Sequence, residues 1–205
     1  MAERKKYNDV KIPILGTSMR VLGNVDELKN KTIKLDLTRR LRGKGLTITF
    51  RIFNHEKDLI AIPNKLELVK AYIRRMMRKR TDYVEDSFQA RCSDVSVFIK
   101  PFLITRKKVS RAIRKNLRNT SKEFLINYVK EKSFCDICNE LKNGLLQKTM
   151  LPKLKKIYPL SFCDVRVFYT KELEKIDLKQ ASKSETQSDE YAEEEVFEES
   201  EKEEE

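Results

Sequence analysis

The chain of 205 residues has no tryptophan, a single histidine and only five glycines. One histidine argues against histidine-based catalysis and against a histidine-rich metal site. No apolar run approaches the roughly 18 residues that a membrane-spanning helix requires. The opening residues, MAERKK, are not followed by an apolar segment. We therefore expect no secretory signal, no membrane partner and a cytoplasmic location.

The four cysteines are Cys92, Cys135, Cys138 and Cys163. In a reducing compartment a disulfide framework is not expected. Cys135 and Cys138 form a CxxC pair, but Cys92 and Cys163 form no second pair that could complete a four-thiolate zinc site. Glycine-rich phosphate-binding motifs are also lacking. We expect free, mostly buried thiols, no metal and no cofactor.

The charge is strongly asymmetric along the chain. The net charge is +12, yet residues 185–205 contain twelve acidic residues and one lysine, which leaves +23 on the remainder. A body this basic attracts polyanions, and nucleic acid is the foremost of these, although charge alone does not separate RNA from DNA or from anionic lipid. From about Lys179 the acidic tail is expected to be disordered. It either stays solvated or folds back on the basic face as an electrostatic mimic of nucleic acid.

Hydropathy periods indicate an α+β fold with a barrel-like or curved sheet that carries packed helices. The Arg42–Gly45 segment reads as a hairpin turn. A capping box of Asn64 and Glu67 marks one helix start, and Ser133 with Asp136 marks another. The expected strands cover residues 33–37, 46–52, 59–62 (stopping at Pro63), 82–92, 95–105 and 163–169. The expected helices cover residues 66–76, 109–129, 134–145 and 152–158, the last beginning at Pro152.

Basic residues gather in four clusters, at residues 39–44, 74–80, 106–118 and 153–156. A single cluster is readily explained as a solvated face, but four in one body would repel one another strongly without a counter-anion. Arginine dominates the first three clusters, and its planar fork suits phosphate. Because exposed aromatic residues are few, we expect recognition of backbone and shape more than base stacking.

Two alternatives follow from the same residues. A metal-dependent nuclease would use the carboxylates of Asp82, Glu85 and Asp86. Arg80 and Arg91 flank these carboxylates, so surface ion pairing is the better account of them. A free RNA chaperone or translation-associated factor would use the same basic surface, and the residues alone do not separate it from a component of a larger particle.

Four segments together resemble a known family. They are VDELKNKTIKLDLTRRLRGKGLTITFRI, LELVKAYIRRMMRKRTDYVEDSF, KPFLITRKKVSRAIRKNLR and KIYPLSFCDVRVFYTKEL. In order and spacing they resemble the archaeal and eukaryotic small-subunit ribosomal proteins called eS-one (the S-three-A-e family), and the acidic tail is similar to archaeal members. The resemblance extends from Val25 to Leu173. Residues 1–24 cannot be matched, so contacts that the family's longer, basic N-terminal extension makes are not assumed here.

The resemblance implies a β-barrel-like sheet with helices beside it, and we expect one such domain over residues 25–178, followed by the tail over residues 179–205 that its composition predicts to be disordered. It implies a structural, non-catalytic constituent of the small ribosomal subunit, on the platform near the mRNA exit. The implied partners are small-subunit rRNA, neighbouring ribosomal proteins and mRNA near the exit channel. The expected RNA-binding residues are Arg39, Arg40, Arg42, Lys44, Arg74, Arg75, Arg78, Lys79, Arg80, Arg106, Lys107, Lys108, Arg111, Arg114, Lys115 and Arg118.

Overall fold

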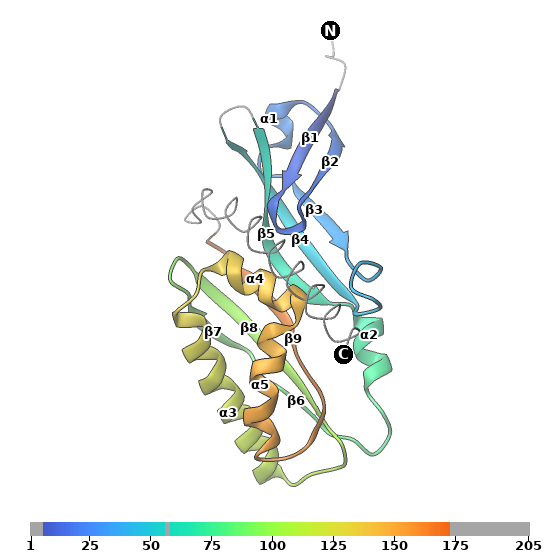
Figure 1. Ribbon diagram of the computed structural model, residues 1–205, viewed down its shortest axis with the longest axis vertical. Coiled ribbons are helices and arrows are strands. Elements are labelled where there is room, and N and C mark those ends of the chain that lie inside the picture. Colours follow the sequence, from blue (N-terminus) through green and yellow to red (C-terminus); the bar gives the residue numbers. More distant parts are fainter. Residues whose placement is uncertain (1–5, 56–57, 173–205) are drawn as a thin grey trace, which may run out of the picture. The chain divides into compact units, whose positions relative to one another are not determined.

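The computed structural model describes residues 6–55 and 58–172 (Figure 1). Within them lie nine strands, five α-helices and one 3-10 helix, which confirms the α+β class. Most strands precede the long helices and a final strand follows them, as the hydropathy periods predict. The described chain forms two compact units, one of residues 6–31, 51–55 and 58–62, the other of residues 32–50 and 63–172. The expected tail, residues 179–205, lies outside the described residues.

The first unit is built on an antiparallel hairpin of β1 (Tyr7–Ile12) and β2 (Thr17–Leu22). A 3-10 turn over Pro13–Leu15 joins the two strands and ends at Gly16, whose φ of +56° suits glycine. The short helix α1 (Val25–Leu28) follows, and β1 also pairs in parallel with β5. The core of this unit consists of Val10, Ile12, Ile14, Leu28, Ile52, Leu59, Ala61 and Ile62.

The second unit holds the longer helices. Its strands are β3 (Thr32–Asp36), β6 (Tyr83–Glu85), β7 (Phe88–Arg91), β8 (Ser96–Thr105) and β9 (Leu160–Thr170), together with parts of β4 (Leu46–His55) and β5 (Asp58–Leu68) that it shares with the first unit. Its helices are α2 (Lys70–Met76), α3 (Arg111–Lys130), α4 (Phe134–Asn143) and α5 (Leu145–Lys155). Both lists agree with the expectation of strands first and helices later.

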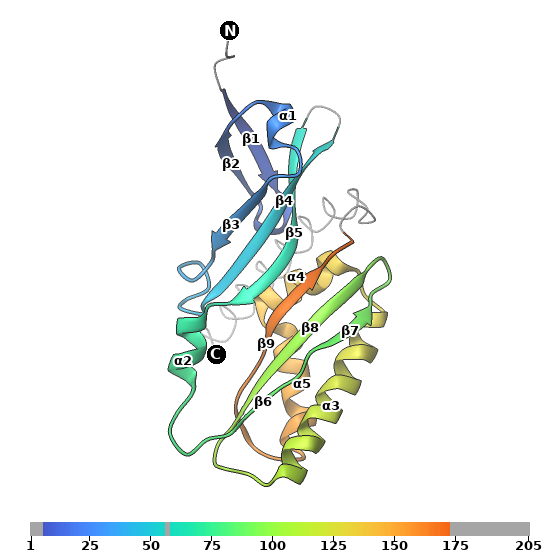
Figure 2. The ribbon, with the colours of Figure 1, turned by 180° about the vertical axis from the view of Figure 1, so that it is seen from behind.

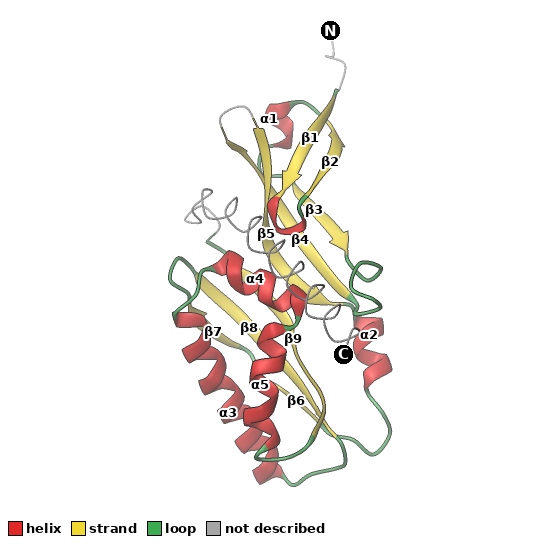
Figure 3. Ribbon diagram, viewed as in Figure 1, coloured by secondary structure: helices red, strands yellow, loops and turns green. Residues whose placement is uncertain are grey.

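Strand β8 organises the sheet of this unit, because it pairs antiparallel with β6, β7 and β9. Strand β9 pairs in turn with β5, and β3 pairs with β4. Helices α3, α4 and α5 cover one face of β6–β9 (Figures 1 and 3), and the view from behind shows the opposite face of these strands (Figure 2). The apolar side of β8 packs beneath the helices, with Val97, Ile99 and Leu103 at most 1% exposed.

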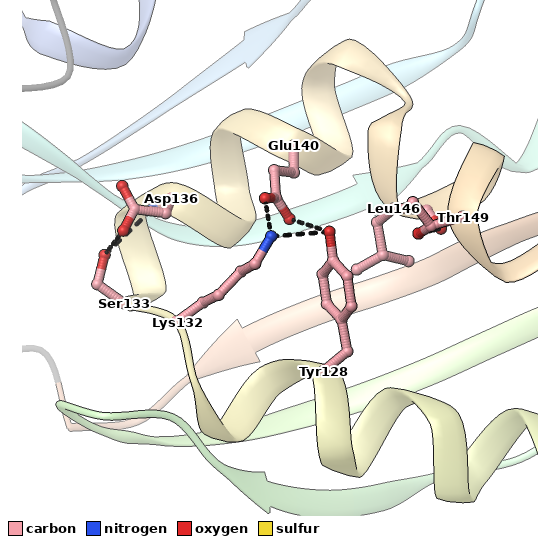
Figure 4. Close-up of polar contacts among 7 residues, drawn as sticks. All are labelled: Tyr128, Lys132, Ser133, Asp136, Glu140, Leu146 and Thr149. Atoms are coloured by element: carbon pink, nitrogen blue, oxygen red, sulfur yellow. Dashed lines mark hydrogen bonds and ion pairs between the residues drawn. The ribbon is translucent and has the colours of Figure 1, made fainter. Parts of the chain in front are cut away.

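Helices α3 and α4 are locked together by a polar contact (Figure 4). Tyr128 donates a hydrogen bond of 2.8 Å to Glu140, and the ammonium of Lys132 binds both side chains. Burial alone would lower the pKa of Lys132. The hydrogen bonds to Glu140 and Tyr128 outweigh that effect, so the pKa of Lys132 lies above its ordinary value. At the start of α4, Ser133 accepts from the N–H of Asp136, as the sequence predicts.

Three expected boundaries are wrong. Strand β5 does not stop at Pro63, and the Asn64 capping box does not form, because β9 pairs with β5 at Lys65–Glu67 and the chain remains extended to Leu68. The strand expected over residues 82–92 is divided into β6 and β7. Helix α5 begins at Leu145, with Pro152 inside it. Buried Leu146, Met150 and Leu154 hold that helix in place despite the missing N–H.

Candidate nucleic-acid interface

All sixteen basic residues expected to bind RNA lie in the second unit. They occupy the turn between β3 and β4, the end of α2 with the loop after it, and the loop that leads into α3 with the first two turns of that helix. Every one of them except Lys44 and Arg114 is exposed. We call these three sets the turn cluster, the α2 cluster and the α3 cluster.

The turn cluster is held by its own backbone. Thr38 donates from both its N–H and its hydroxyl to Asp36, and these hydrogen bonds lower the pKa of the Asp36 carboxyl. Gly43 donates to the carbonyl of Thr38, and Arg42 has a positive φ of 49°. The turn therefore presents Arg42 to solvent in a fixed loop rather than on a flexible linker.

Lys44 differs from the other members of the turn cluster. Its ammonium lies 3.1 Å from Asp164 Oδ2 and donates to the carbonyl of Leu141 at 3.2 Å. The Lys44 side chain is only 20% exposed, and the Asp164 side chain 6%. The structure thus places Lys44 in an internal ion pair, which no local pattern could indicate because the partner, Asp164, lies far along the chain.

The turn and α2 clusters lie beside each other because of Gly45. Its carbonyl accepts from the N–H of Val69 at 2.9 Å, and a Cβ at this position would lie 2.7 Å from Cβ of Tyr72. Only glycine allows this approach without a shift. As a result Arg75 reaches the carbonyl of Gly43, and Arg39 and Arg75 line the same surface hollow.

The α2 cluster occupies the C-terminal end of a short helix and the loop behind it. Arg74 and Arg75 lie in the last turn, where cations are favoured by the helix dipole. Arg75 also lies over the ring of Tyr72, with its guanidinium carbon 5.5 Å from the ring centroid. The loop after α2 contains Arg78, Lys79 and Arg80, which are all exposed. The cluster is therefore accessible to the phosphates of a nucleic acid.

The α3 cluster begins on a loop that Asp82 fixes. The Asp82 carboxylate accepts from the N–H of Val109 at 3.0 Å, and Ser110 caps the helix by accepting from Ile113. On the helix, Arg111, Arg114, Lys115 and Arg118 follow the i, i+3, i+4, i+7 spacing of one face. These four cations and Tyr83 line one hollow. Tyr83 was not expected to belong to the site; in the sequence, only its position beside apolar Val84 in a strand pattern indicates a side chain that faces outward.

The fourth basic cluster, on α5, is also exposed at Lys153, Lys155 and Lys156. Lys153 lies 4.6 Å from the ring centroid of Phe124 on α3, which is a cation–π contact within the helical layer. We do not include this cluster in the interface.

The three carboxylates that a nuclease would use each bind a different partner within the protein. Asp82 holds Val109, Glu85 pairs with Arg166 at 2.7 Å, and Asp86 accepts from the N–H of Ser87. Within residues 6–55 and 58–172, no group of three or more histidine, cysteine or acidic side chains is arranged to hold a metal ion.

All four cysteines are free thiols, and three of them are buried. Burial raises the pKa of Cys92, Cys135 and Cys163 to about 12, and that of Cys138 well above its ordinary value. A protonated, buried thiol behaves as a small apolar side chain. In the described part of the chain, no helix has both the length and the apolar character needed to cross a membrane.

Comparison with known proteins gives a consistent result. The model of the Ribosomal S3Ae family matches residues 5–186, which includes residues 5–24 of the N-terminal segment that carried no recognisable resemblance. The chain is 30% identical over 115 residues to the "Small ribosomal subunit protein eS1" of Nanoarchaeum equitans, an alignment that covers 54% of this chain and 58% of the relative. It is 27% identical over 103 residues to the protein of the same name from Haloquadratum walsbyi, with 50% of this chain and 49% of the relative covered. The aligned parts thus span about half the length of these relatives.

Proposed function

The chain belongs to the ribosomal S3Ae family, and on that basis we propose that it is a structural constituent of the small ribosomal subunit that binds and orders rRNA. The observation that carries the proposal is the concentration of exposed arginine and lysine on the second unit, in the turn, α2 and α3 clusters. Cations arranged in this way contact phosphates and position a protein on RNA without reading sequence. Both relatives described above are named as small-subunit proteins.

The turn and α2 clusters form the first half of the proposed surface. Because Gly45 brings α2 against the turn, Arg75 of the α2 cluster reaches Gly43 of the turn and lines one hollow with Arg39 of the turn cluster. Lys44 is left out of the proposed phosphate ligands, since its ammonium is paired with Asp164. Its proposed role is to hold the turn against α4 and β9, so that its neighbours face outward.

We place the protein, within this proposal, on the platform of the small subunit near the mRNA exit, in the cytoplasm, with neighbouring ribosomal proteins as further partners and mRNA close by. The proposed role involves no catalysis. In support, Asp82, Glu85 and Asp86 each already serve a structural contact.

Sedimentation of the tagged full-length chain from its native lysate through a high-salt sucrose gradient tests the proposal. We expect cosedimentation with the small subunit at about one copy per particle. A variant with Arg74, Arg75 and Arg78 reversed to glutamate should move toward the top of the gradient, whereas Lys148→Glu, an exposed charge outside the clusters, should not. If the unaltered chain remains at the top, the protein is a free RNA-binding factor instead.

A further inference from the structure

The hollow beside the N-terminal half of α3 combines cations with an aromatic ring. Arg111, Arg114, Lys115 and Arg118 come from the helix, and Tyr83 comes from β6, which pairs only with β8 among the described strands. The volume of the hollow is about 340 Å³. None of the described residues that line it carries a carboxylate. We call it the α3–β6 groove; Figures 1 and 2 show α3 running alongside β6 and β7.

The ring of Tyr83 is exposed to solvent but held in place by a buried ring. It is 54% exposed, although its ring stacks on that of Phe102 with centroids 6.0 Å apart and planes inclined by 28°. Phe102 is 1% exposed and belongs to the core. The buried ring therefore supports the exposed one from behind, and little conformational entropy is lost when a flat ligand stacks on Tyr83.

The arginines of the groove are positioned for an anion. Arg118 donates from Nε to the carbonyl of Glu85 at 3.3 Å, which anchors its side chain beside β6. The Nε of Arg114 is buried and has no hydrogen-bond acceptor among the described residues. A buried donor without an acceptor is costly, and a rotation of the Arg114 side chain toward the groove would bring this donor to a phosphate oxygen.

We propose that the α3–β6 groove binds a single unpaired nucleotide of RNA, with its base stacked on Tyr83 and its phosphates held by Arg114 and the neighbouring cations. The proposal rests on the proposed function and adds to it a distinction between RNA structures. In a continuous A-form duplex every base face is covered by its neighbours, so only a bulged, looped or terminal nucleotide can present a face to Tyr83. In the proposed function the turn and α2 clusters contact phosphates, which single strands and duplexes both present, so these clusters would not make this distinction.

The test compares two RNA probes on the full chain by fluorescence anisotropy. One is a single strand of about 12 nucleotides, and the other is a fully paired duplex of about 24 base pairs, in which terminal bases are few; affinities are compared per phosphate. We expect Tyr83→Leu, which keeps an apolar contact with Phe102 but has no aromatic face, to bind the single strand roughly tenfold more weakly while binding to the duplex changes little. Tyr83→Phe keeps the ring and should bind both probes as the unaltered chain does.

Tyr7→Ala is the control, because Tyr7 is 72% exposed and belongs to the other unit, which contains none of the sixteen basic residues of the three clusters. It should leave both affinities unchanged. Equal weakening on both probes, or no weakening by either Tyr83→Leu or Tyr83→Ala, would overturn the nucleotide site and leave the proposed function intact. Failure of the unaltered chain to bind either probe would overturn the proposed function itself.

Discussion

Lys44 and Asp164 form a largely buried ion pair, in which Nζ lies 3.1 Å from Oδ2. Asp164 also accepts from Gln147 at 2.6 Å and from the N–H of Val165 at 2.7 Å. The pair ties the turn between β3 and β4 to the last strand of the same unit. Its neighbour Arg42, two residues away, is exposed. One short basic segment thus contains two cations with different roles, and this difference can be measured.

Lys44→Met should destabilise the protein and leave RNA contacts largely intact. Removing one partner leaves the Asp164 carboxylate buried without its counter-charge, so we expect the free energy of unfolding in urea to fall by about 3 kcal/mol. Arg42→Met should change stability by less than about 0.5 kcal/mol and should weaken RNA binding. A stable Lys44→Met protein with weakened RNA binding would contradict this assignment.

Charge reversal at Arg74, Arg75 or Arg78 should weaken RNA binding and flatten its dependence on salt. Each lost phosphate contact reduces the slope of log affinity against log salt by about 0.7–0.9. The measurement is a binding titration at several potassium chloride concentrations, with Lys148→Glu as the control. An unchanged slope would mean that the end of α2 faces solvent or protein in the complex.

Gly45→Ala should weaken RNA binding without removing any charge. The new Cβ would lie 2.7 Å from Cβ of Tyr72, so α2 must shift, at a cost of about 1–3 kcal/mol. The shift separates the turn cluster from the α2 cluster, and we expect lower affinity at unchanged net charge. Gly16→Ala introduces backbone strain at a φ of +56° with nothing within 4 Å, and should leave RNA affinity unaltered.

Stability should fall as the pH rises above about 9. The pKa of Cys135 is about 12 in the folded protein and 9.0 ordinarily, so the unfolded thiol ionises first and folding is favoured fully only below about pH 9. The loss continues as the pH approaches 12, by at most about 1.4 kcal/mol per pH unit for each such thiol. Urea unfolding under reducing conditions between about pH 8 and 10 measures it. Cys135→Ala should show a shallower decline, and an identical decline would assign the effect to other groups.

Deletion of residues 185–205 should raise affinity for non-specific RNA. The segment carries a net charge of −11, so its removal leaves a body of +23. Long-range attraction to any polyanion then increases, most strongly at low salt. Binding to an unrelated duplex RNA provides the measurement, and the thermal midpoint of unfolding should stay unchanged. A lower midpoint would contradict the expectation of a disordered tail.

Local patterns predicted the elements whose signal lies within their own residues. Period-two alternation located β3, β4 and β9, and helical spacing located α3 and α4, with Ser133 as the cap of α4. These features depend on side-chain faces and capping atoms that a short stretch of sequence contains in full.

Features that depend on distant partners could not be predicted. The extension of β5 past Pro63 requires β9, about 100 residues later, and the internal role of Lys44 requires Asp164. The α3–β6 groove also depends on a distant partner, because Tyr83 lies next to the arginines of α3 only when α3 packs beside β6. The sequence identified the basic clusters but not which cations face an anion and which hold the fold.

The sharing of β4 and β5 between the two units has a consequence for biosynthesis. Neither unit is a continuous stretch of chain, since residues 32–50 of the second unit come between two parts of the first, and residues 51–62 of the first come between two parts of the second. As the chain emerges during translation, all strands of the first unit are synthesised early. Lys65 of β5, in contrast, can pair only after Tyr169 of β9 has been synthesised. Pairings of such long sequence separation form slowly and leave strand edges unpaired in the meantime. A nascent chain paused before residue 160 would therefore be exposed to misassembly, and timely delivery to its RNA or to a chaperone would protect it.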